Sequence, residues 1–181
     1  MPEYKVIDNE HYPNKRALII DAANSTQARR KACKIWNLKI NDRYYGASSL
    51  KIEKITNVSL EGKTVCFFFN TTNCFKEKSG QCSLFASEEF LKQFEDNPNT
   101  EKANPYHCCK VAKLVEIRDP LLFPIYLYKH KCGHYQSGSG LHRTCIAGHL
   151  KIEVPINLEE EPHSTCTACT NPEEKDILIK F

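Results

Sequence analysis

Short apolar runs alternate with polar stretches along residues 17–132, and their spacing predicts strands and one long helix. Ala17–Ile20 is an apolar run typical of a short strand. From Ser25 to Ile40, apolar residues recur at helical spacing, and Asn24 directly before them favours a helix N-cap. Ser49–Thr56 alternates between apolar and polar residues, which predicts a second strand. This order predicts an α+β fold, in which a sheet and a helix bury their apolar faces against each other.

The stretch Thr64–Cys82 begins with β-branched and aromatic residues, which suit a pleated, half-buried surface. By period-two alternation, Val65 and the phenylalanines two and four residues later share one face, while Cys66 and Asn70 share the other. Asn70-Thr-Thr is a glycosylation sequon, and a glycan cannot point into a core. We therefore expect Val65 to face the core and Cys66 to face outward.

Cysteine content and sequons favour a secreted glycoprotein. The chain of 181 residues has ten cysteines, an even number. Three sequons begin at Asn24, Asn57 and Asn70, and three such signals in a cysteine-rich chain favour an oxidising compartment. Cys74 and Cys82 stand at the two ends of a polar loop after the strand, a plausible place for a loop-closing disulfide.

Composition and motif content exclude several classes of function. A net charge of +3 is too small to indicate a nucleic-acid partner or an anionic membrane surface. No apolar run approaches the length of a membrane-spanning helix, so we expect no membrane insertion. Nucleophile elbows, phosphate-binding loops and zincin motifs are also missing from the sequence. We therefore expect no enzymatic activity, no catalytic residue and no cofactor.

The last segment, residues 133–181, is rich in cysteine and histidine. Cys166 and Cys169 have a spacing that lets two thiolates share one tetrahedral zinc ion, together with Cys132, Cys145 or the nearby histidines. The alternative, which we favour, is that disulfides pin this segment to the preceding domain and that it holds no metal. The cysteines available for such disulfides include Cys33, Cys66 and Cys108.

The helix and the segments behind it contain a specific order of residues. Ala32, Trp36 and Asn37 provide a small residue, an aromatic and an asparagine, and Asn41-Asp42 precedes the second strand. Further along come the pair Cys74 and Cys82, then Cys109–Ile117 and Ile125–Cys132.

Over residues 17–132 this order resembles the cystatin superfamily. The resemblance implies that an antiparallel sheet wraps around one long helix, that Cys109–Ile117 and Ile125–Cys132 are the last two strands, and that disulfides join Cys74 to Cys82 and Cys109 to Cys132. The chain is then expected to have three parts: a polar N-terminal arm (1–16), a cystatin-like domain (17–132) and, beyond the resemblance, a disulfide-pinned extension (133–181).

Cystatins inhibit papain-like proteases through a Gln-x-Val-x-Gly hairpin, a glycine in the N-terminal arm and a Pro-Trp turn. In this chain the hairpin lacks the Gln of that motif and has Leu60 in place of its Val. No glycine precedes the helix, and the turn has no Trp. The resemblance therefore implies a secreted protein that binds a protein partner with degraded inhibitory loops. The residues expected at the interface are Val58, Leu60, Gly62, Leu121, Leu122 and Phe123.

The partner expected from this resemblance is a cysteine protease or an extracellular receptor or matrix protein. Two alternatives stay open at this point. One is an active cysteine-protease inhibitor with altered specificity, and the other is a small zinc-binding protein that uses the C-terminal cysteines and histidines.

Overall fold

The computed structural model describes residues 1–9, 16–40, 49–94, 103–171 and 177–181. Within these residues the fold is α+β, as the sequence predicts, with an eight-stranded mixed sheet and helices packed on it. The strand order is β2-β1-β3-β7-β5-β6-β4-β8. No helix in the described part of the chain is long and apolar enough to cross a membrane.

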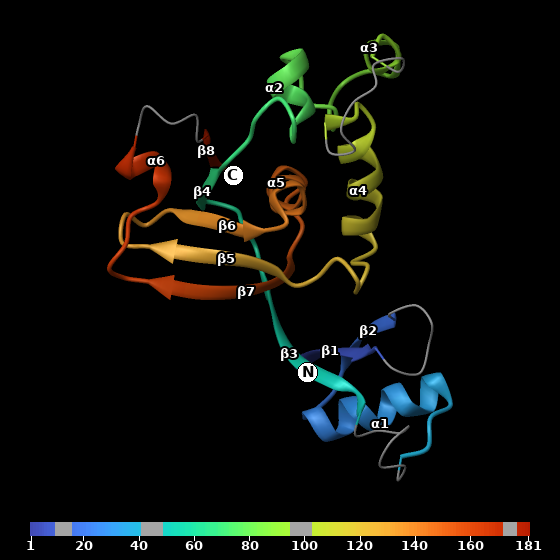
Figure 1. Cartoon of the computed structure of the whole chain (residues 1–181). Coiled ribbons are helices and arrows are strands. Elements are labelled where there is room, and N and C mark those ends of the chain that lie inside the picture. Colours follow the sequence, from blue (N-terminus) through green and yellow to red (C-terminus); the bar gives the residue numbers. More distant parts are fainter. Residues whose placement is uncertain (10–15, 41–48, 95–102, 172–176) are drawn as a thin grey trace.

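Three strands and one helix form the N-terminal end of the sheet. β1 (Glu3–Asp8) pairs antiparallel with both β2 (Arg16–Asp21) and β3 (Lys51–Val58). Helix α1 (Ser25–Trp36) covers these strands, and the side chain of Asn24 caps it by accepting a hydrogen bond from the Gln27 amide, as the sequence predicts. Figure 1 shows this small lobe set apart from the rest of the molecule, with β3 connecting the two.

The larger part of the sheet is built from the second half of the chain. β5 (Ile125–His130) pairs in parallel with β7 (Val154–Glu161) and antiparallel with β6 (Tyr135–Ser139). β4 (Thr64–Phe67) then pairs in parallel with β6 and antiparallel with β8 (Ile177–Lys180). The end of β3 pairs with the start of β7 and joins both parts into one sheet.

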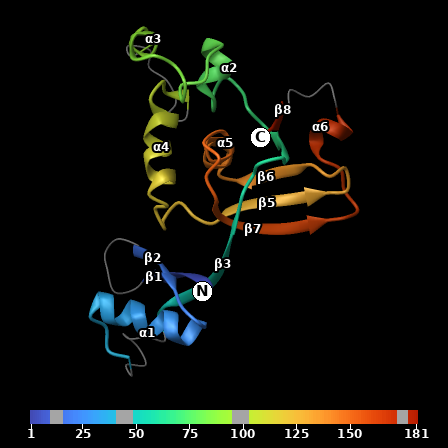
Figure 2. The ribbon, with the colours of Figure 1, turned by 180° about the vertical axis from the view of Figure 1, so that it is seen from behind.

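Helices α4 (His107–Glu116) and α5 (Leu141–His149) pack against each other and against this larger sheet. Two short helices, α2 (Phe75–Ser79) and α3 (Glu88–Lys92), lie beyond them, and α6 (Thr167–Thr170) lies at the opposite edge, as Figures 1 and 2 show. The largest buried cluster lies between the helices and the sheet and contains Phe123, Ile125, Leu127, Ile146 and Val154.

The expected arm over residues 1–16 is wrong, since β1 lies between two other strands of the sheet. Residues 10–15 of that range lie outside the described part of the chain. Val6 is fully buried, and the Lys5 ammonium donates a hydrogen bond to the Phe123 carbonyl oxygen. The expected extension is also wrong, because residues 133–181 supply β6, β7, β8, α5 and α6, and β7 is a central strand of the sheet.

The strand expected at Cys109–Ile117 is helix α4 instead. Cys108, Ala112 and Val115 are its buried residues, and their spacing places them on one face of a helix. A sheet wrapped around one long helix is not observed, because α1 has 12 residues and covers β1, β2 and β3. The relationship to cystatins stays a prediction.

Candidate metal centre

Four side chains converge at the edge of the sheet where β5 and β7 end. The ligand atoms of Cys132, His134, Cys166 and Cys169 all lie within 4.8 Å of one another. His134 Nδ1 lies 3.4 Å from Cys166 Sγ and 3.3 Å from Cys169 Sγ. Around a tetrahedral zinc ion, bonds of about 2.3 Å to sulfur and about 2.0–2.1 Å to nitrogen place neighbouring ligand atoms roughly 3.5–3.8 Å apart. The spacing of these side chains therefore fits one zinc ion.

The parallel pairing of β5 with β7 brings the two halves of the centre together. His130 is in register with Glu161 at the last residue of each strand. Because parallel strands end at the same edge of a sheet, the segments that follow them also begin side by side. The Lys131 amide donates to the Ser164 carbonyl oxygen at 2.8 Å, which fixes the second segment against the first.

A tight turn between β5 and β6 presents Cys132 and His134. The Gly133 amide donates to the His130 carbonyl oxygen at 2.9 Å, and the His130 amide donates to the His134 carbonyl oxygen at 3.0 Å. Gly133 has a φ of +79°, a conformation that only glycine adopts without strain. The turn therefore places the Cys132 and His134 side chains on the same side of the hairpin, toward Cys166 and Cys169.

A single helical turn presents Cys166 and Cys169. The amides of Cys169 and Thr170 both donate to the Cys166 carbonyl oxygen, at 3.0 and 3.1 Å. Cys166 is fully buried, whereas Cys169 is exposed. The turn brings the thiols of residues i and i+3 to one point, which is the reason that Cys-x2-Cys suits a metal.

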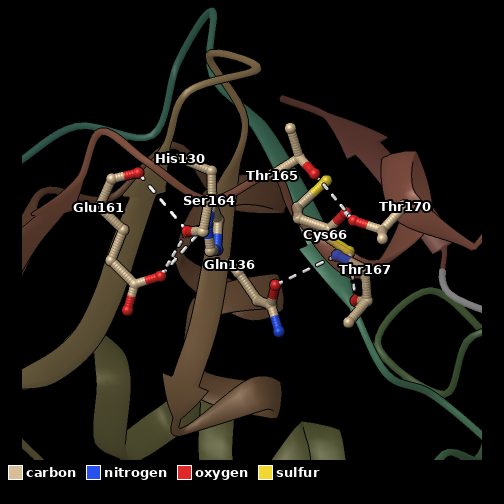
Figure 3. Close-up of polar contacts among 9 residues, drawn as sticks. Cys66, His130, Gln136, Glu161, Ser164, Thr165, Thr167 and Thr170 are labelled. Carbon is tan, nitrogen blue, oxygen red and sulfur yellow. Dashed lines mark hydrogen bonds and ion pairs between the residues drawn. The ribbon is translucent and has the colours of Figure 1, made fainter.

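Hydrogen bonds hold the segment that contains Cys166 in place, and Figure 3 shows those among His130, Ser164 and Glu161 and the one between Gln136 and Thr167. His130 Nδ1 lies 2.7 Å from Ser164 Oγ, and this hydroxyl donates to Glu161 Oε2 at 2.7 Å. Since the Ser164 hydroxyl has one proton and donates it to Glu161, His130 must donate from Nδ1. On the other side, the Thr167 amide donates to Gln136 Oε1 at 3.4 Å. These contacts hold the segment that contains Cys166 against β5 and β6.

The local environment shifts the pKa values of the Cys132 and Cys166 thiols in opposite directions. Burial raises the pKa of the Cys132 thiol, but hydrogen bonds with the Cys166 and His134 amides and with the Cys166 and Cys169 thiols outweigh it, so the pKa lies below its ordinary value. Burial raises the pKa of Cys166 to about 11, and hydrogen bonds to the thiols of Cys169 and Cys132 add to this rise. Metal coordination removes the proton from a ligating thiol outright, so both residues can serve as thiolate ligands.

Four protein ligands fill a tetrahedral zinc ion completely. Catalytic zinc sites usually have three protein ligands and keep one position for water or substrate. Three sulfur ligands and one nitrogen ligand are the donor set of structural zinc sites. A metal ion held by these four ligands would therefore be structural rather than catalytic.

The two expected disulfides are not formed. All ten cysteines lie in the described part of the chain, and none is joined to another by a disulfide. Cys132 belongs to the metal centre, whereas the Cys109 thiol donates to the Ser83 carbonyl oxygen at 3.0 Å. Cys74 and Cys82 line a cavity elsewhere, which is described below. Cys66, expected to face outward, is buried beside Thr167, because helices and strands cover both faces of β4.

The expected binding loops are largely buried. Leu60 and Phe123 are each 1% exposed and belong to the main core cluster, and Val58 and Leu122 pack against it. The Gly62 amide donates to the Phe181 carbonyl oxygen at 2.8 Å. Of the expected interface, Leu121 is the large apolar side chain that stays exposed, at 52%. These loops therefore do not form an exposed apolar wedge.

The three sequon asparagines all have structural contacts. Asn24 caps α1, and Asn70 accepts hydrogen bonds from the amides of Thr72 and Asn73. Asn57 Nδ2, the atom to which a glycan would be attached, donates to Glu3, while its Oδ1 accepts from Arg118 at 2.7 Å. A glycan on Asn57 would replace one of the two hydrogens on this nitrogen, beside the Glu3 carboxylate.

Of the metal-binding residues, the sequence identified Cys132, Cys166 and Cys169 as candidates but not His134 specifically. Cys145, another candidate ligand, lies at a different cavity together with His149. The signal for His134 is its position two residues after Cys132, since residues at this spacing lie on one side both in a strand and in this hairpin turn. Comparison of the chain with protein-family models, with curated proteins and with solved structures finds no match.

Proposed function

We propose that this chain is a zinc-binding protein in which one zinc ion, held by Cys132, His134, Cys166 and Cys169, is a structural element. The observation that carries the proposal is the convergence of these four ligand atoms within 4.8 Å. The ion ties residues 162–171 to the β5–β6 hairpin. A structural role also agrees with the four-ligand donor set, which offers no open position for chemistry.

Metal analysis of the purified full chain tests this proposal. We expect about one zinc per chain, as structural sites with four protein ligands bind one ion. Cys169→Ser should lose the zinc, because its thiol is a ligand and lies exposed at the surface, so that the change disturbs little packing. Cys109→Ser is the matched control and should keep it. A wild-type chain without zinc, or a Cys169→Ser chain with a full equivalent, would contradict the proposal.

A second candidate function is the one implied by the resemblance to cystatins, namely a secreted protein that binds a protease or another protein partner. The observation in its favour is the exposed Leu121, which lies with Leu122 on the wall of a cavity of about 630 Å³. An inhibition assay against papain-like proteases separates the candidates. Inhibition that Leu121→Ser abolishes, with zinc content unchanged, would favour the binding protein.

A further inference from the structure

Four other cysteines line a single cavity between α2, α4 and α5. The cavity has a volume of about 160 Å³, and its wall includes Cys74, Cys82, Cys108 and Cys145. Cys74 is the N-cap of α2, Cys82 follows that helix, Cys108 lies in α4 and Cys145 lies in α5. Figures 1 and 2 both show α2 close to α5 and to the start of α4. The fold thus gathers thiols from distant parts of the sequence at one place.

The four thiols lie close enough to influence one another. Burial raises the pKa of Cys145 far above its ordinary value, and negative charge at Cys82, Cys108 and Cys74 adds to this rise. Burial raises the pKa of Cys108 to about 11, with a further contribution from Cys82 and Cys74. A cavity many times larger than the ~10–15 Å³ that one water requires is costly to leave empty, and few polar groups line this one to hold water.

The thiols of this cavity do not converge as those of the candidate zinc centre do. Among the described residues, the group of three or more possible ligands close enough to hold one metal ion is the one around Cys132. Two sulfurs on one tetrahedral zinc lie about 3.8 Å apart, given bonds of about 2.3 Å. In an iron–sulfur cluster the thiolates bind different irons, so the sulfurs surround an inorganic core and stand further apart.

We propose that Cys74, Cys82, Cys108 and Cys145 bind a cluster of four irons and four sulfides. Four cysteine thiolates are the usual ligands of such a cluster, and here they surround a cavity rather than a point. Their different origins along the chain agree with one thiolate for each iron.

The surroundings of the cavity suit a negatively charged cluster. Lys76 lies on its wall, where its positive charge opposes the rise in the pKa of Cys145, although Glu77 is also on the wall. His142 Nδ1 lies 3.4 Å from Cys108 Sγ, and its Nε2 lies 2.5 Å from the Asn73 carbonyl oxygen. Since a carbonyl oxygen only accepts, His142 donates to it from Nε2, and Nδ1 is the ring atom that faces the Cys108 thiol. Hydrogen bonds to the sulfurs and shielding from solvent are the features that tune such clusters.

The test is reconstitution of the full chain with iron and sulfide without oxygen, followed by iron, sulfide and zinc analysis and visible absorption. We expect about four irons and four sulfides per chain, with the broad absorption of iron–thiolate charge transfer. Cys108→Ser and Cys145→Ser should each lose most of this iron. Cys109→Ser should keep it, because its thiol is bonded to the Ser83 carbonyl oxygen, and it is therefore a matched control one residue from Cys108.

Measurement of zinc beside iron separates a failure of the cluster proposal from a failure of the proposed zinc site. Cys169→Ser should keep the iron while it loses zinc, and Cys145→Ser should keep zinc while it loses iron, which also shows that the variant is folded. A wild-type chain that takes up no iron, that takes up only two irons, or that binds a second zinc in its place would overturn the proposal. So would a Cys145→Ser chain that retains the full cluster.

Discussion

Removal of zinc should loosen residues 162–171 and leave the main core folded. Within 162–171 Cys166 is the one buried residue, and α6 has four residues, far too few for a helix to be stable alone. Fixing the backbone of one residue costs about 1–2 kcal/mol, so about ten residues cost roughly 10–20 kcal/mol. Structural zinc sites bind with about 10–16 kcal/mol. Because burial contributes so little in this segment, zinc coordination is the contribution large enough to offset this entropic cost.

Hydrogen exchange of the full chain with and without a chelator measures this effect. The amides of Cys169 and Thr170, which donate to the Cys166 carbonyl oxygen, should exchange faster after chelation, as should the Lys131 amide. The amides of β1 (residues 3–8) should not change, because β1 pairs with β2 and β3 in the N-terminal lobe. Re-addition of zinc should restore the original pattern.

The reasoning fails if the chelated chain holds no zinc and residues 162–171 keep their protection. Equal loss of protection in β1 would also refute it, since zinc would then support the whole fold rather than one segment. Cys109→Ser supplies the control for thiol chemistry unrelated to the metal, and it should behave as the wild-type chain does.

Three further predictions concern the core, acid stability and thiols. Phe67→Ala should cost about 3–5 kcal/mol in denaturant unfolding, because Phe67 is fully buried and stacks on Phe69. The Arg118 guanidinium, hydrogen-bonded to Glu3, holds the pKa of Glu3 below its ordinary value of 4.5 despite partial burial. This contact therefore stabilises the folded state above pH 4.5, and the stabilisation is lost as the pH falls through the lower pKa of the folded state. Glu3→Gln should therefore lose less stability on acidification than the wild-type chain. Intact mass under denaturing, non-reducing conditions should change by nothing on reduction, since all ten cysteines are free.

Each of these has a clear contrary result. A cost below about 1 kcal/mol for Phe67→Ala would place that ring outside the tightly packed core. Equal acid sensitivity of Glu3→Gln and the wild-type chain would show that the contact with Arg118 does not set the pH dependence. A mass increase on reduction would show that disulfides form.

Hydrophobic periodicity predicted the first strands and the first helix because those elements have one buried and one exposed side. α1 and β3 show regular spacing of this kind, and Asn24 marks the helix start with a capping side chain. The strand expected at Cys109–Ile117 came from the resemblance to cystatins and not from the hydrophobic pattern, and this segment is part of helix α4, which packs against α5.

The N-terminal strand was missed because its charged residues hid its burial. Lys5 is 6% exposed, yet its ammonium is bonded to the Phe123 carbonyl oxygen, a contact between residues 118 apart in the sequence. Asp8 is likewise buried and paired with Arg16 at 2.8 Å. From the sequence alone, without knowledge of their partners, these residues are expected at the surface, because buried charges are rare unless they are paired.

Local spacing predicts only two of the four proposed metal ligands. Cys166 and Cys169 form a local turn, so their spacing alone indicates a shared metal. Cys132 and His134 lie more than thirty residues earlier, and only the parallel register of His130 with Glu161 brings them to the same edge. Local spacing contains no information about that pairing, and so the choice among Cys132, Cys145 and the histidines stayed open.

The same structural features also bear on the compartment in which the chain works. An even cysteine count and three sequons favour secretion only if the cysteines are paired and the asparagines are accessible. Here nine of the ten cysteines line either the candidate metal centre or the cavity between α2, α4 and α5, or lie buried, and none is in a disulfide. Asn57 uses the nitrogen that a glycan needs to contact Glu3. Thiolates can hold a metal only while they stay reduced, so the proposed metal centre and the predicted secretion make opposite demands on these cysteines, and the compartment stays a prediction.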